Sequence, residues 1–220
     1  MKATPLLLLI ALLSLSLPLQ AAEMALTFEA GTGTGSLNYE SSASGRQIYN
    51  EKWDHDLSGK ARAVVIHIVD ESSFIYGLGN HSYAISGKGT TEETDSVGLS
   101  TYETRNYTVA GNFFLLGYQW EAWGFLRFEP QLRIGYNNRA YVQGDSELSE
   151  TGTGINEDRF THESDATVVV VSLPLNFKMG GFFFGVQYQA ISAGLEISKD
   201  DAKNNYSLTS AVMGQFGFLY

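Results

Sequence analysis

Charged side chains recur at alternate positions in one short stretch of the sequence, which contains Arg127, Glu129 and Arg133. Lys178 and Glu29 take equivalent positions in two other stretches that show the same alternation. If these positions share an enclosed space, the charges must pair, because an unpaired buried charge is costly. The five residues therefore predict a polar network. Its simpler interpretation is a structural set of salt bridges, and the alternative is a gated polar path for small solutes.

Residues that could act in nucleophilic or acid–base catalysis are scattered along the chain. His162, Glu163 and Ser164 adjoin one another in the longest expected loop, and such groups could support hydrolysis if they converged. His81 and Ser82 are also adjacent, but neighbouring strand residues point to opposite faces and cannot form a base–nucleophile pair. We therefore predict no catalytic residue, no cofactor and no metal site.

Two further patterns could suggest ligand binding. The segment 31–35 reads Gly-Thr-Gly-Thr-Gly, but it lacks the lysine and the following helix of a phosphate-binding loop. It fits better as a strand of small residues that passes a crowded interior. The segment 138–165 holds seven acidic residues against Arg139 and Arg159. The simpler interpretation is a solvated acidic loop, and the alternative is cation bridging to phosphates or contact with a partner.

Composition narrows the class of protein that could carry these residues. The chain has 220 residues, which fits one domain, and no cysteine, which excludes disulfides and thiolate metal sites. Its net charge of -10 argues against nucleic acid as a partner. The mean hydropathy of -0.09 is too polar for a bundle of membrane helices. Only 17% of the residues are charged and 44% are hydrophobic, so disorder is also a poor description.

The first 22 residues have the design of a secretory signal peptide. Lys2 supplies a basic start, residues 5–17 are an apolar run, and Pro18 ends that run before small residues suited to cleavage. The run is shorter than the roughly 20 apolar residues of a membrane anchor. We predict a signal peptide over residues 1–22 and a single domain over residues 23–220.

The rest of the chain alternates in polarity with the period of β-strands. In the clearest segment, 126–137, the even positions are apolar or tyrosine, and the odd positions are arginine, glutamate, glutamine, glycine and asparagine. Successive strand side chains point to opposite faces, so this segment predicts a strand with one apolar and one polar face. Seven other segments alternate similarly, near residues 26–31, 63–68, 74–81, 107–120, 169–178, 184–190 and 208–220.

The links between these segments alternate in length. Short links are expected at residues 70–73, 121–124 and 180–181, and long ones at about 40–60, 86–105, 138–165 and 193–205. Short turns at one end and long loops at the other indicate an up-and-down antiparallel meander. Because the strand number is even, both termini should lie at the end with the short turns.

The volumes of the side chains indicate which face points inward. An eight-stranded barrel has an interior just wide enough for side chains. The apolar faces carry Phe, Tyr, Leu or Trp at most positions and would overfill it, whereas the polar faces carry many glycines. We therefore expect the apolar face to point outward, toward lipid. Aromatic residues should form two belts, one near the short turns and one near the long loops, the second made by Tyr39, Tyr83, Tyr107, Tyr136, Tyr141 and Tyr206.

The chain ends in alternating aromatic residues, Phe216, Phe218 and Tyr220. This ending resembles the C-terminal strand of bacterial outer-membrane β-barrel proteins, which the barrel-assembly machinery recognises. Together with the signal peptide and eight strands, the chain is similar to the small barrels of the OmpA/OmpX type. The resemblance implies an eight-stranded antiparallel up-and-down transmembrane β-barrel in the outer membrane of a Gram-negative bacterium, with both termini in the periplasm.

The function expected from this resemblance is structural, or surface interaction through the acidic extracellular loops, with a plugged polar lumen. Two alternatives remain open: a narrow channel for small solutes, and an outer-membrane enzyme that modifies lipid, since small barrel enzymes acting on lipid A use histidine, serine and a carboxylate. The expected partners are outer-membrane lipid and lipopolysaccharide, the barrel-assembly machinery, and an extracellular partner bound by the loops.

Overall fold

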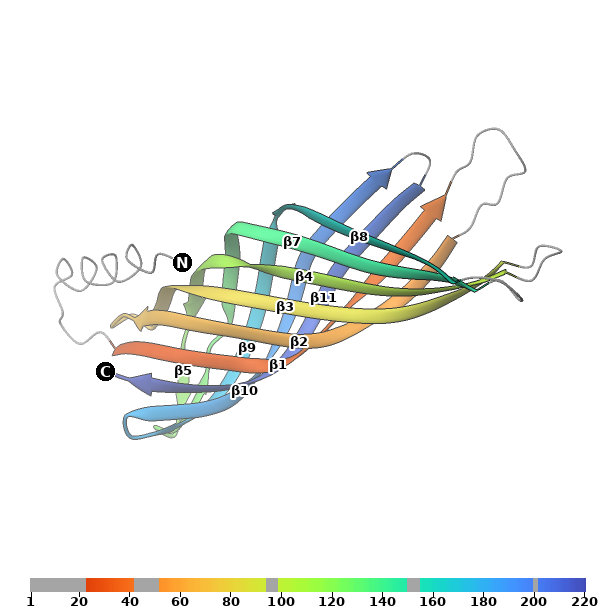
Figure 1. The fold of residues 1–220 in the computed structure, drawn as a ribbon. Helices are drawn as coiled ribbons and strands as arrows, with labels where there is room; N and C mark the ends of the chain where they lie inside the picture. The colour runs from red at the N-terminus through yellow and green to blue at the C-terminus, as the bar shows by residue number, and fades with distance from the viewer. Residues whose placement is uncertain (1–22, 42–51, 94–98, 150–154, 200–201) are drawn as a thin grey trace.

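The computed structural model describes residues 23–41, 52–93, 99–149, 155–199 and 202–220 (Figure 1). The predicted signal peptide, residues 1–22, lies outside this range. The described residues form no helix long and apolar enough to cross a membrane. Their strands are β1 (Glu23–Ser41), β2 (Lys52–Val69), β3 (Phe74–Glu93), β4 (Leu99–Tyr118), β5 (Trp120–Ala122), β6 (Leu126–Phe128), β7 (Gln131–Ser149), β8 (Ile155–Ala166), β9 (Val168–Met179), β10 (Phe182–Lys199) and β11 (Ala202–Leu219).

These strands close into a ring of eight. Short interruptions divide some strands, so that β5 continues β4, β6 continues into β7, and β8 continues into β9. Each neighbouring pair is antiparallel, and the ring runs β1, β2, β3, β4, β7, β9, β10 and β11 before it returns to β1. The expected eight-stranded antiparallel barrel is therefore confirmed.

Both ends of the ring-forming chain meet at the end that carries the short turns. The backbone N–H of Met24 donates to the carbonyl of Tyr220, and the N–H of Tyr220 donates to the carbonyl of Met24. Between β2 and β3, the Asp70 carboxylate accepts hydrogen bonds from the N–H groups of Ser72 and Phe74, each 2.9 Å long. The other short turns are residues 123–125 and Gly180-Gly181. We call this the short-turn end and the opposite one the far end.

The pairing register sets the tilt of the strands. Followed from strand to strand around the ring, the partners of Leu126 are Phe177, Phe184, Phe216, Phe28, Val64, Asn80, Asn112 and finally Tyr136. The path returns to the same strand of the ring ten residues beyond its start. A stagger of this size tilts eight strands by about 40° to the barrel axis, as in other closed barrels.

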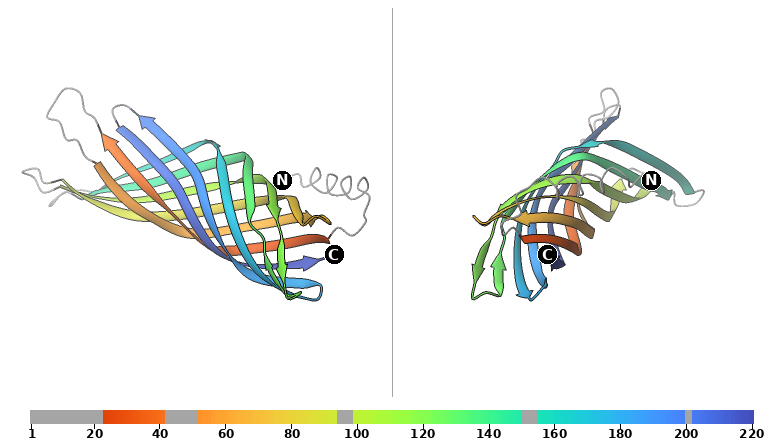
Figure 2. Two further views of the ribbon diagram at one scale, coloured as in Figure 1. Left: turned by 180° about the vertical axis from the view of Figure 1, so that it is seen from behind. Right: turned by 90° about the vertical axis from the view of Figure 1, so that its left-hand side faces the viewer.

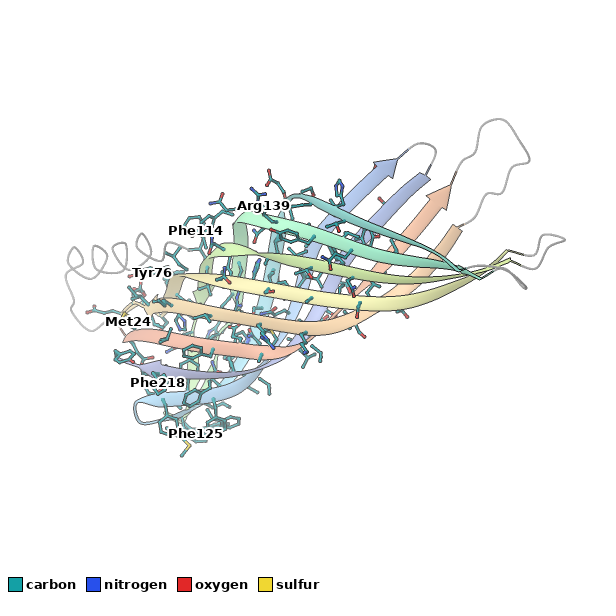
Figure 3. All side chains as sticks on the ribbon, in the orientation of Figure 1. Met24, Tyr76, Phe114, Phe125, Arg139 and Phe218 are labelled. Atoms are coloured by element: carbon teal, nitrogen blue, oxygen red, sulfur yellow. The ribbon has the colours of Figure 1, made fainter. Side chains whose placement is uncertain are left out.

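An apolar belt covers the outside of the barrel around the short-turn end (Figure 3). Large apolar side chains such as Phe114, Leu116 and Val186 are 54–60% exposed there. The outward direction expected for the apolar faces is confirmed for every alternating segment except part of the last. Aromatic rings near the short turns are also exposed, as expected: Phe74, Tyr76, Trp120, Trp123, Phe125, Phe182, Phe218 and Tyr220.

The strands extend well beyond this belt, and here the expected loop lengths are wrong. The regions expected as long loops are largely strand: β7 and β8, for example, pair from Asn138↔Ala166 to Ser149↔Ile155. Beyond the belt the contrast is reversed: inward side chains such as Ala140 and Val142 are apolar and buried, and outward ones such as Arg139 and Gln143 are polar and exposed. Such a strand lacks the outward face of large apolar residues, so its sequence resembles a polar loop.

At the far end the ring divides into two sheets. Pairing between β2 and β3 stops at Ser58↔Ser86, and within the described residues β8 pairs with β7 alone. The ends of β10, β11, β1 and β2 therefore diverge from those of β3, β4, β7 and β8 (Figures 1 and 2). Each four-stranded sheet has backbone groups without strand partners along both edges in this region.

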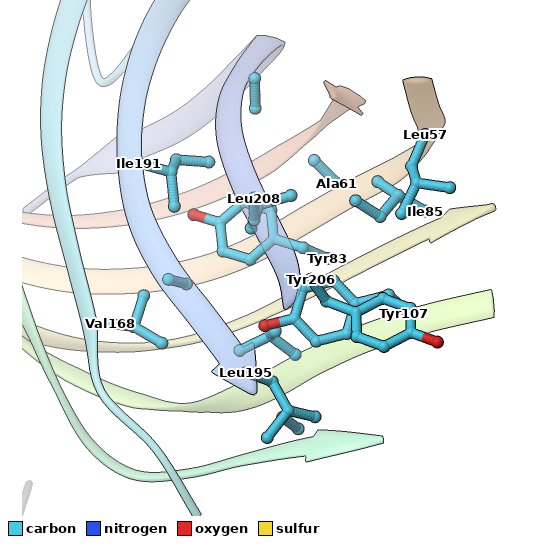
Figure 4. Packing of buried hydrophobic residues seen from close by; sticks show 14 of the residues in the cluster. Leu57, Ala61, Tyr83, Ile85, Tyr107, Val168, Ile191, Leu195, Tyr206 and Leu208 are labelled. Atoms are coloured by element: carbon cyan, nitrogen blue, oxygen red, sulfur yellow. The ribbon is translucent and has the colours of Figure 1, made fainter. Parts of the chain in front are cut away.

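The interior changes from polar to apolar along the barrel. Toward the far end it is filled by a buried apolar cluster that includes Leu37, Leu57, Tyr107, Val142 and Leu208 (Figure 4). Tyr83, Tyr107 and Tyr206 point into this cluster with at most 1% exposure, so their expected place in an outer aromatic belt is wrong. Tyr136 is partly exposed and Tyr141 is exposed, and the side chain of Tyr39 lies outside the described residues. The outward side chains of this part are largely polar, such as Thr34, Ser58 and Gln143, and burial favours apolar side chains inside it.

Two β-bulges accompany the change of polarity. In β11, Thr34 pairs with Ser210 and Gly35 with Leu208, so Thr209 is an extra residue that reverses the alternation. Leu208 therefore points inward, contrary to the outward direction expected from the sequence. In β7 the bulge lies at Asn137, whose φ of 52° is in the left-handed region that asparagine tolerates better than most residues.

Candidate functional site

A buried ion pair crosses the barrel where its interior is polar. Nη1 and Nη2 of Arg133 donate to the two carboxylate oxygens of Glu29, each at 2.7 Å. Both side chains are only 1% exposed. Arg133 belongs to β7 and Glu29 to β1, which are four strands apart in either direction around the ring. The pair therefore joins opposite walls and lies across the barrel axis.

Neutral amides and a ring complete the surroundings of this pair. Nη2 of Arg133 also donates to Oε1 of Gln131 at 2.9 Å and to Oε1 of Gln187 at 3.3 Å. The Arg133 guanidinium lies 5.0 Å from the centroid of the Phe113 ring, a distance typical of cation–π contacts. The Glu29 carboxylate accepts from the Gln189 amide at 3.5 Å. These contacts fix the guanidinium in one orientation.

A second ion-pair network lies nearer the short-turn end. The Arg127 guanidinium donates to both carboxylate oxygens of Glu23, and its Nε donates to Glu121 at 2.9 Å. Lys178 donates to Glu23 at 3.1 Å. The buried Glu129 carboxylate instead accepts a hydrogen bond from Asn176 at 3.0 Å. Since Arg127 is on β6 and Glu23 on β1, this network also connects opposite walls.

The structure thus places Arg127, Glu129, Arg133, Lys178 and Glu29 on the inner face, divided between two levels. Glu29 pairs with Arg133, whereas Lys178 and Arg127 share Glu23. Glu23 was not among the residues predicted for this network, because it was expected only as the start of the mature chain. Its alternation with Ala25, Thr27 and Glu29 could have identified it. Glu121 was missed because it was expected in a turn.

His81 forms a further polar contact where the polar interior meets the apolar cluster toward the far end. Nε2 of His81 and Oδ1 of Asn138 are 2.8 Å apart, and the His81 ring stacks on Phe113 with centroids 5.3 Å apart. Gly79 and Gly111 face these groups. A Cβ at Gly79 would lie 2.3 Å from the Phe113 ring, and one at Gly111 would lie 2.0 Å from the Asn138 side chain. The glycines leave room for the crowded rings, as expected for a narrow interior.

The residues considered for catalysis are not brought together. His162, Glu163 and Ser164 lie in β8 rather than in a loop, so Glu163 points to the face opposite His162 and Ser164. Glu163 pairs instead with Arg139 at 2.5 Å on the outer surface. Among the described residues, no three histidine, aspartate or glutamate side chains are close enough to hold a metal ion.

The remaining sequence patterns fall on ordinary strand positions. Residues 31–35 belong to β1, and Gly33 and Gly35 are buried on its inner face. Phe216, Phe218 and Tyr220 lie at the end of the chain and point outward into the apolar belt. Of the seven acidic residues expected in a loop, two belong to β7 (Asp145 and Glu147), four belong to β8 (Glu157, Asp158, Glu163 and Asp165), and Glu150 lies outside the described residues.

Comparison with known proteins gives similarity of structure without similarity of sequence. No protein-family model matches the chain, and no curated protein sequence matches it. The outer-membrane protease OmpT of Escherichia coli is 9% identical with a TM-score of 0.53, and the match covers 92% of this chain and 99% of OmpT. OprG of Pseudomonas aeruginosa gives 10% identity and a TM-score of 0.44, covering 89% and 95% of the two chains. Neisserial surface protein A gives 8% and 0.41, covering 90% and 99%.

At these identities the comparisons inform on the fold alone. The similarity to OmpT agrees with what the strands, their closure and the apolar exterior show independently. The chain has the fold of the bacterial outer-membrane β-barrels, in a small form with eight strands.

Proposed function

We propose that this chain is an integral outer-membrane protein with a closed lumen, and that its role is structural or is surface contact through the part projecting beyond the membrane. The apolar belt supports the membrane location. Large exposed apolar side chains surround the barrel, and a continuous apolar exterior of this extent is unfavourable in water. Closure of the ring satisfies the backbone groups within the belt, as lipid requires.

One observation supports the closed lumen above all others: the Arg133–Glu29 pair joins opposite walls of the barrel and is almost completely buried. The Arg127–Glu23 pair repeats this arrangement nearer the short-turn end. On the far-end side of both ion pairs, the apolar cluster fills the interior. A solute would have to displace charged pairs in one half of the barrel and packed apolar side chains in the other.

The orientation follows from the same features. We place the short-turn end, with both ends of the ring, in the periplasm, and the far end outside the cell. The exposed aromatic ending Phe216, Phe218 and Tyr220 then enters the membrane from the periplasm, where we propose that the barrel-assembly machinery binds it. The signal peptide predicted over residues 1–22 would deliver the chain to that compartment.

Planar lipid bilayers test the closed lumen. The refolded wild-type barrel, with insertion verified by its heat-modifiable migration in gels, is expected to give no stable conductance steps. Arg133→Ala removes a cross-barrel group, but the apolar cluster above it should still prevent conductance. Arg139→Ala, on the outer surface, is the matched control. Stable steps from the wild type would contradict the closed lumen and favour the second candidate, a narrow channel that uses the polar half of the interior.

A further inference from the structure

The outer face of β1 and β2 changes its chemistry in three steps along the barrel. Toward the short-turn end this face is apolar, and its last pair of large apolar residues is Phe28 and Val64, which are 46% and 42% exposed. Two residues further along β2, a distance of about 7 Å, comes Arg62, and Lys60 follows on the same face. Beyond them the face carries small hydroxyl side chains. We call this the β1–β2 column: Phe28, Val64, Arg62, Lys60, Thr34, Ser36, Asp56 and Ser58.

The two cations of the column are unusual in this acidic chain. Arg62 and Lys60 are exposed, and neither forms an ion pair or hydrogen bond with the described part of the chain. Arg139, in contrast, is on the outer face of β7 and pairs with Glu163. On the outer face of β2, Arg62 lies directly beyond the last apolar residue, Val64, so it is at the edge of the apolar belt that faces the far end. A long cationic side chain at this position extends toward the lipid head groups.

A surface hollow adjoins Arg62. The residues that pair with Arg62 in the neighbouring strands are small, Ala30 on β1 and Ser82 on β3. The hollow has a volume of about 350 Å³, and its lining residues are Phe28, Glu29, Ala30, Arg62, Ala63, Val64, Asn80 and Ser82. The Glu29 carboxylate is directed away from it, into the barrel interior, where it pairs with Arg133. The hollow therefore combines one cation and two hydrogen-bonding side chains above an apolar base.

A second hollow follows further from the belt. It has a volume of about 420 Å³ and is lined by Thr34, Ser36, Asp56, Ser58 and Thr209, with Gly35 and Leu57. Several hydroxyls here are already ordered: Thr34 bonds to Ser210, and Ser36 to Ser207, each at 2.8 Å. Hydroxyl and carboxylate groups on a rigid sheet suit hydrogen bonding to sugar hydroxyls.

From this order of groups we infer that the β1–β2 column binds one phosphorylated glycolipid of the outer leaflet, lipopolysaccharide. Its acyl chains contact Phe28 and Val64, a phosphate accepts hydrogen bonds from Arg62 and Lys60, and its sugars lie against the hydroxyls beyond. Arginine matches phosphate well because its planar guanidinium donates two parallel hydrogen bonds. The inference rests on the proposed membrane location, since only an inserted barrel presents the column to lipid.

Binding to the folded full-length barrel in lipopolysaccharide-free detergent micelles tests this site. We compare the wild type with the double variant Lys60→Ser and Arg62→Ser, which introduces the residue type already present at Ser58 on the same face. Arg139→Ser is the control, because it also removes an outward cation above the belt. The probes are lipopolysaccharide, the same glycolipid with its phosphates removed, and inorganic phosphate, each titrated and followed by native mass spectrometry.

We expect the double variant to bind lipopolysaccharide at least about tenfold more weakly, as the loss of charge-assisted hydrogen bonds implies, with the control unchanged. The dephosphorylated glycolipid should bind the wild type as weakly as lipopolysaccharide binds the double variant. Equal affinity of wild type and double variant for lipopolysaccharide would overturn the inference. Full displacement by millimolar inorganic phosphate would also overturn it, because the site would then recognise a free anion.

The proposed function fails in a different way from this inference. A barrel that remains in the soluble fraction, or that conducts in bilayers, contradicts the proposed location or the closed lumen. If the barrel inserts and stays closed, but the substitution of Arg62 and Lys60 leaves its affinity for lipopolysaccharide unchanged, only the glycolipid site is contradicted.

Discussion

At the scale of single residues, the central feature is the buried pair of Arg133 and Glu29. Two charges removed from water are tolerated here because each meets the other through two short hydrogen bonds, with further amides around them. Such a pair contributes little net stability compared with apolar residues, but the loss of one partner leaves a buried charge uncompensated. The pair therefore determines which substitutions the interior tolerates.

We predict that Arg133→Leu destabilises the barrel by about 3–5 kcal/mol, because Glu29 stays buried after it has lost its charged partner. The double variant Glu29→Leu and Arg133→Leu should recover most of this loss. The measurement is the free energy of unfolding in urea for the barrel refolded into lipid vesicles. Arg139→Leu, which breaks a pair that is 58% and 42% exposed, should change it by less than about 1 kcal/mol. A double variant no more stable than the single one would argue against the charge as the cause.

At the scale of elements, each strand serves two surroundings in succession. The outward side chains of β7 are apolar from Gln131 to the bulge at Asn137, and beyond the bulge they are Arg139, Tyr141 and Gln143. The bulge shifts the alternation by one residue, so the strand can reverse which face is apolar without leaving the sheet. The bulge at Thr209 has the same effect in β11.

A new charge should cost much more stability in one half of β7 than in the other. Leu132→Arg places a cation on the lipid-facing side and should cost about 2–4 kcal/mol, with impaired assembly. Gln143→Arg, on the outward face of the same strand beyond the bulge, should change stability by less than about 0.5 kcal/mol. Heat-modifiable migration and outer-membrane fractionation measure both effects. Normal insertion of Leu132→Arg would disprove the assignment of this face to lipid.

At the scale of the whole molecule, the two halves of the barrel have opposite distributions of apolar and polar residues. Around the short-turn end it is built as a membrane protein, apolar outside and polar inside. Toward the far end it is built as a water-soluble protein, with an apolar interior and hydroxyl or charged groups outside. The apolar cluster there comes from both four-stranded sheets, and this shared packing holds them together where hydrogen bonds between the sheets have ended (Figure 4).

This division predicts unequal costs for two substitutions in β11. Leu208→Ala, in the buried cluster, should lower the free energy of unfolding by about 2–5 kcal/mol because it leaves a cavity. Val212→Ala, which is 59% exposed on the belt, should cost about 1–1.5 kcal/mol, since lipid fills the vacated space. Urea unfolding in vesicles measures both. Equal costs would contradict the soluble-type packing of the far end.

The sequence predicted the membrane part of the barrel well and the remainder poorly, for a physical reason. Between Leu126 and Tyr136 an apolar face meets lipid and a charged face meets a narrow interior, so the alternation is strong. In residues 138–144 the outward residues are polar and the only apolar inward ones are Ala140 and Val142, so a strand was mistaken for a loop. Tyr107 and Tyr206 were assigned to a belt from their position along the chain. The bulge at Thr209, which no local signal shows, reverses the face of Tyr206, whereas Tyr107 simply shares the inward face of Phe113 and Leu115 in β4.

The residues of the candidate site could be predicted from the sequence, but their pairing across the barrel could not. Strand alternation placed Arg127, Glu129 and Arg133 on one inner face, but it contained no information on which strands lie opposite one another. The pairing of Arg133 with Glu29 depends on the closure and stagger of the ring, which are properties of the complete sheet. The contribution of Glu23 also required the position of β1 relative to β6 and β9.

The pairing of β1 with β11 has a consequence for how the molecule forms. The first and last strands bond along almost their whole length, from Ala25↔Leu219 to Ser41↔Ala202. Contacts so distant in the chain are slow to form. Until the final strand is available, both strands present unpaired edges that invite aggregation. A chain with this topology therefore passes through a state whose strand edges stay open to aggregation until the ring closes.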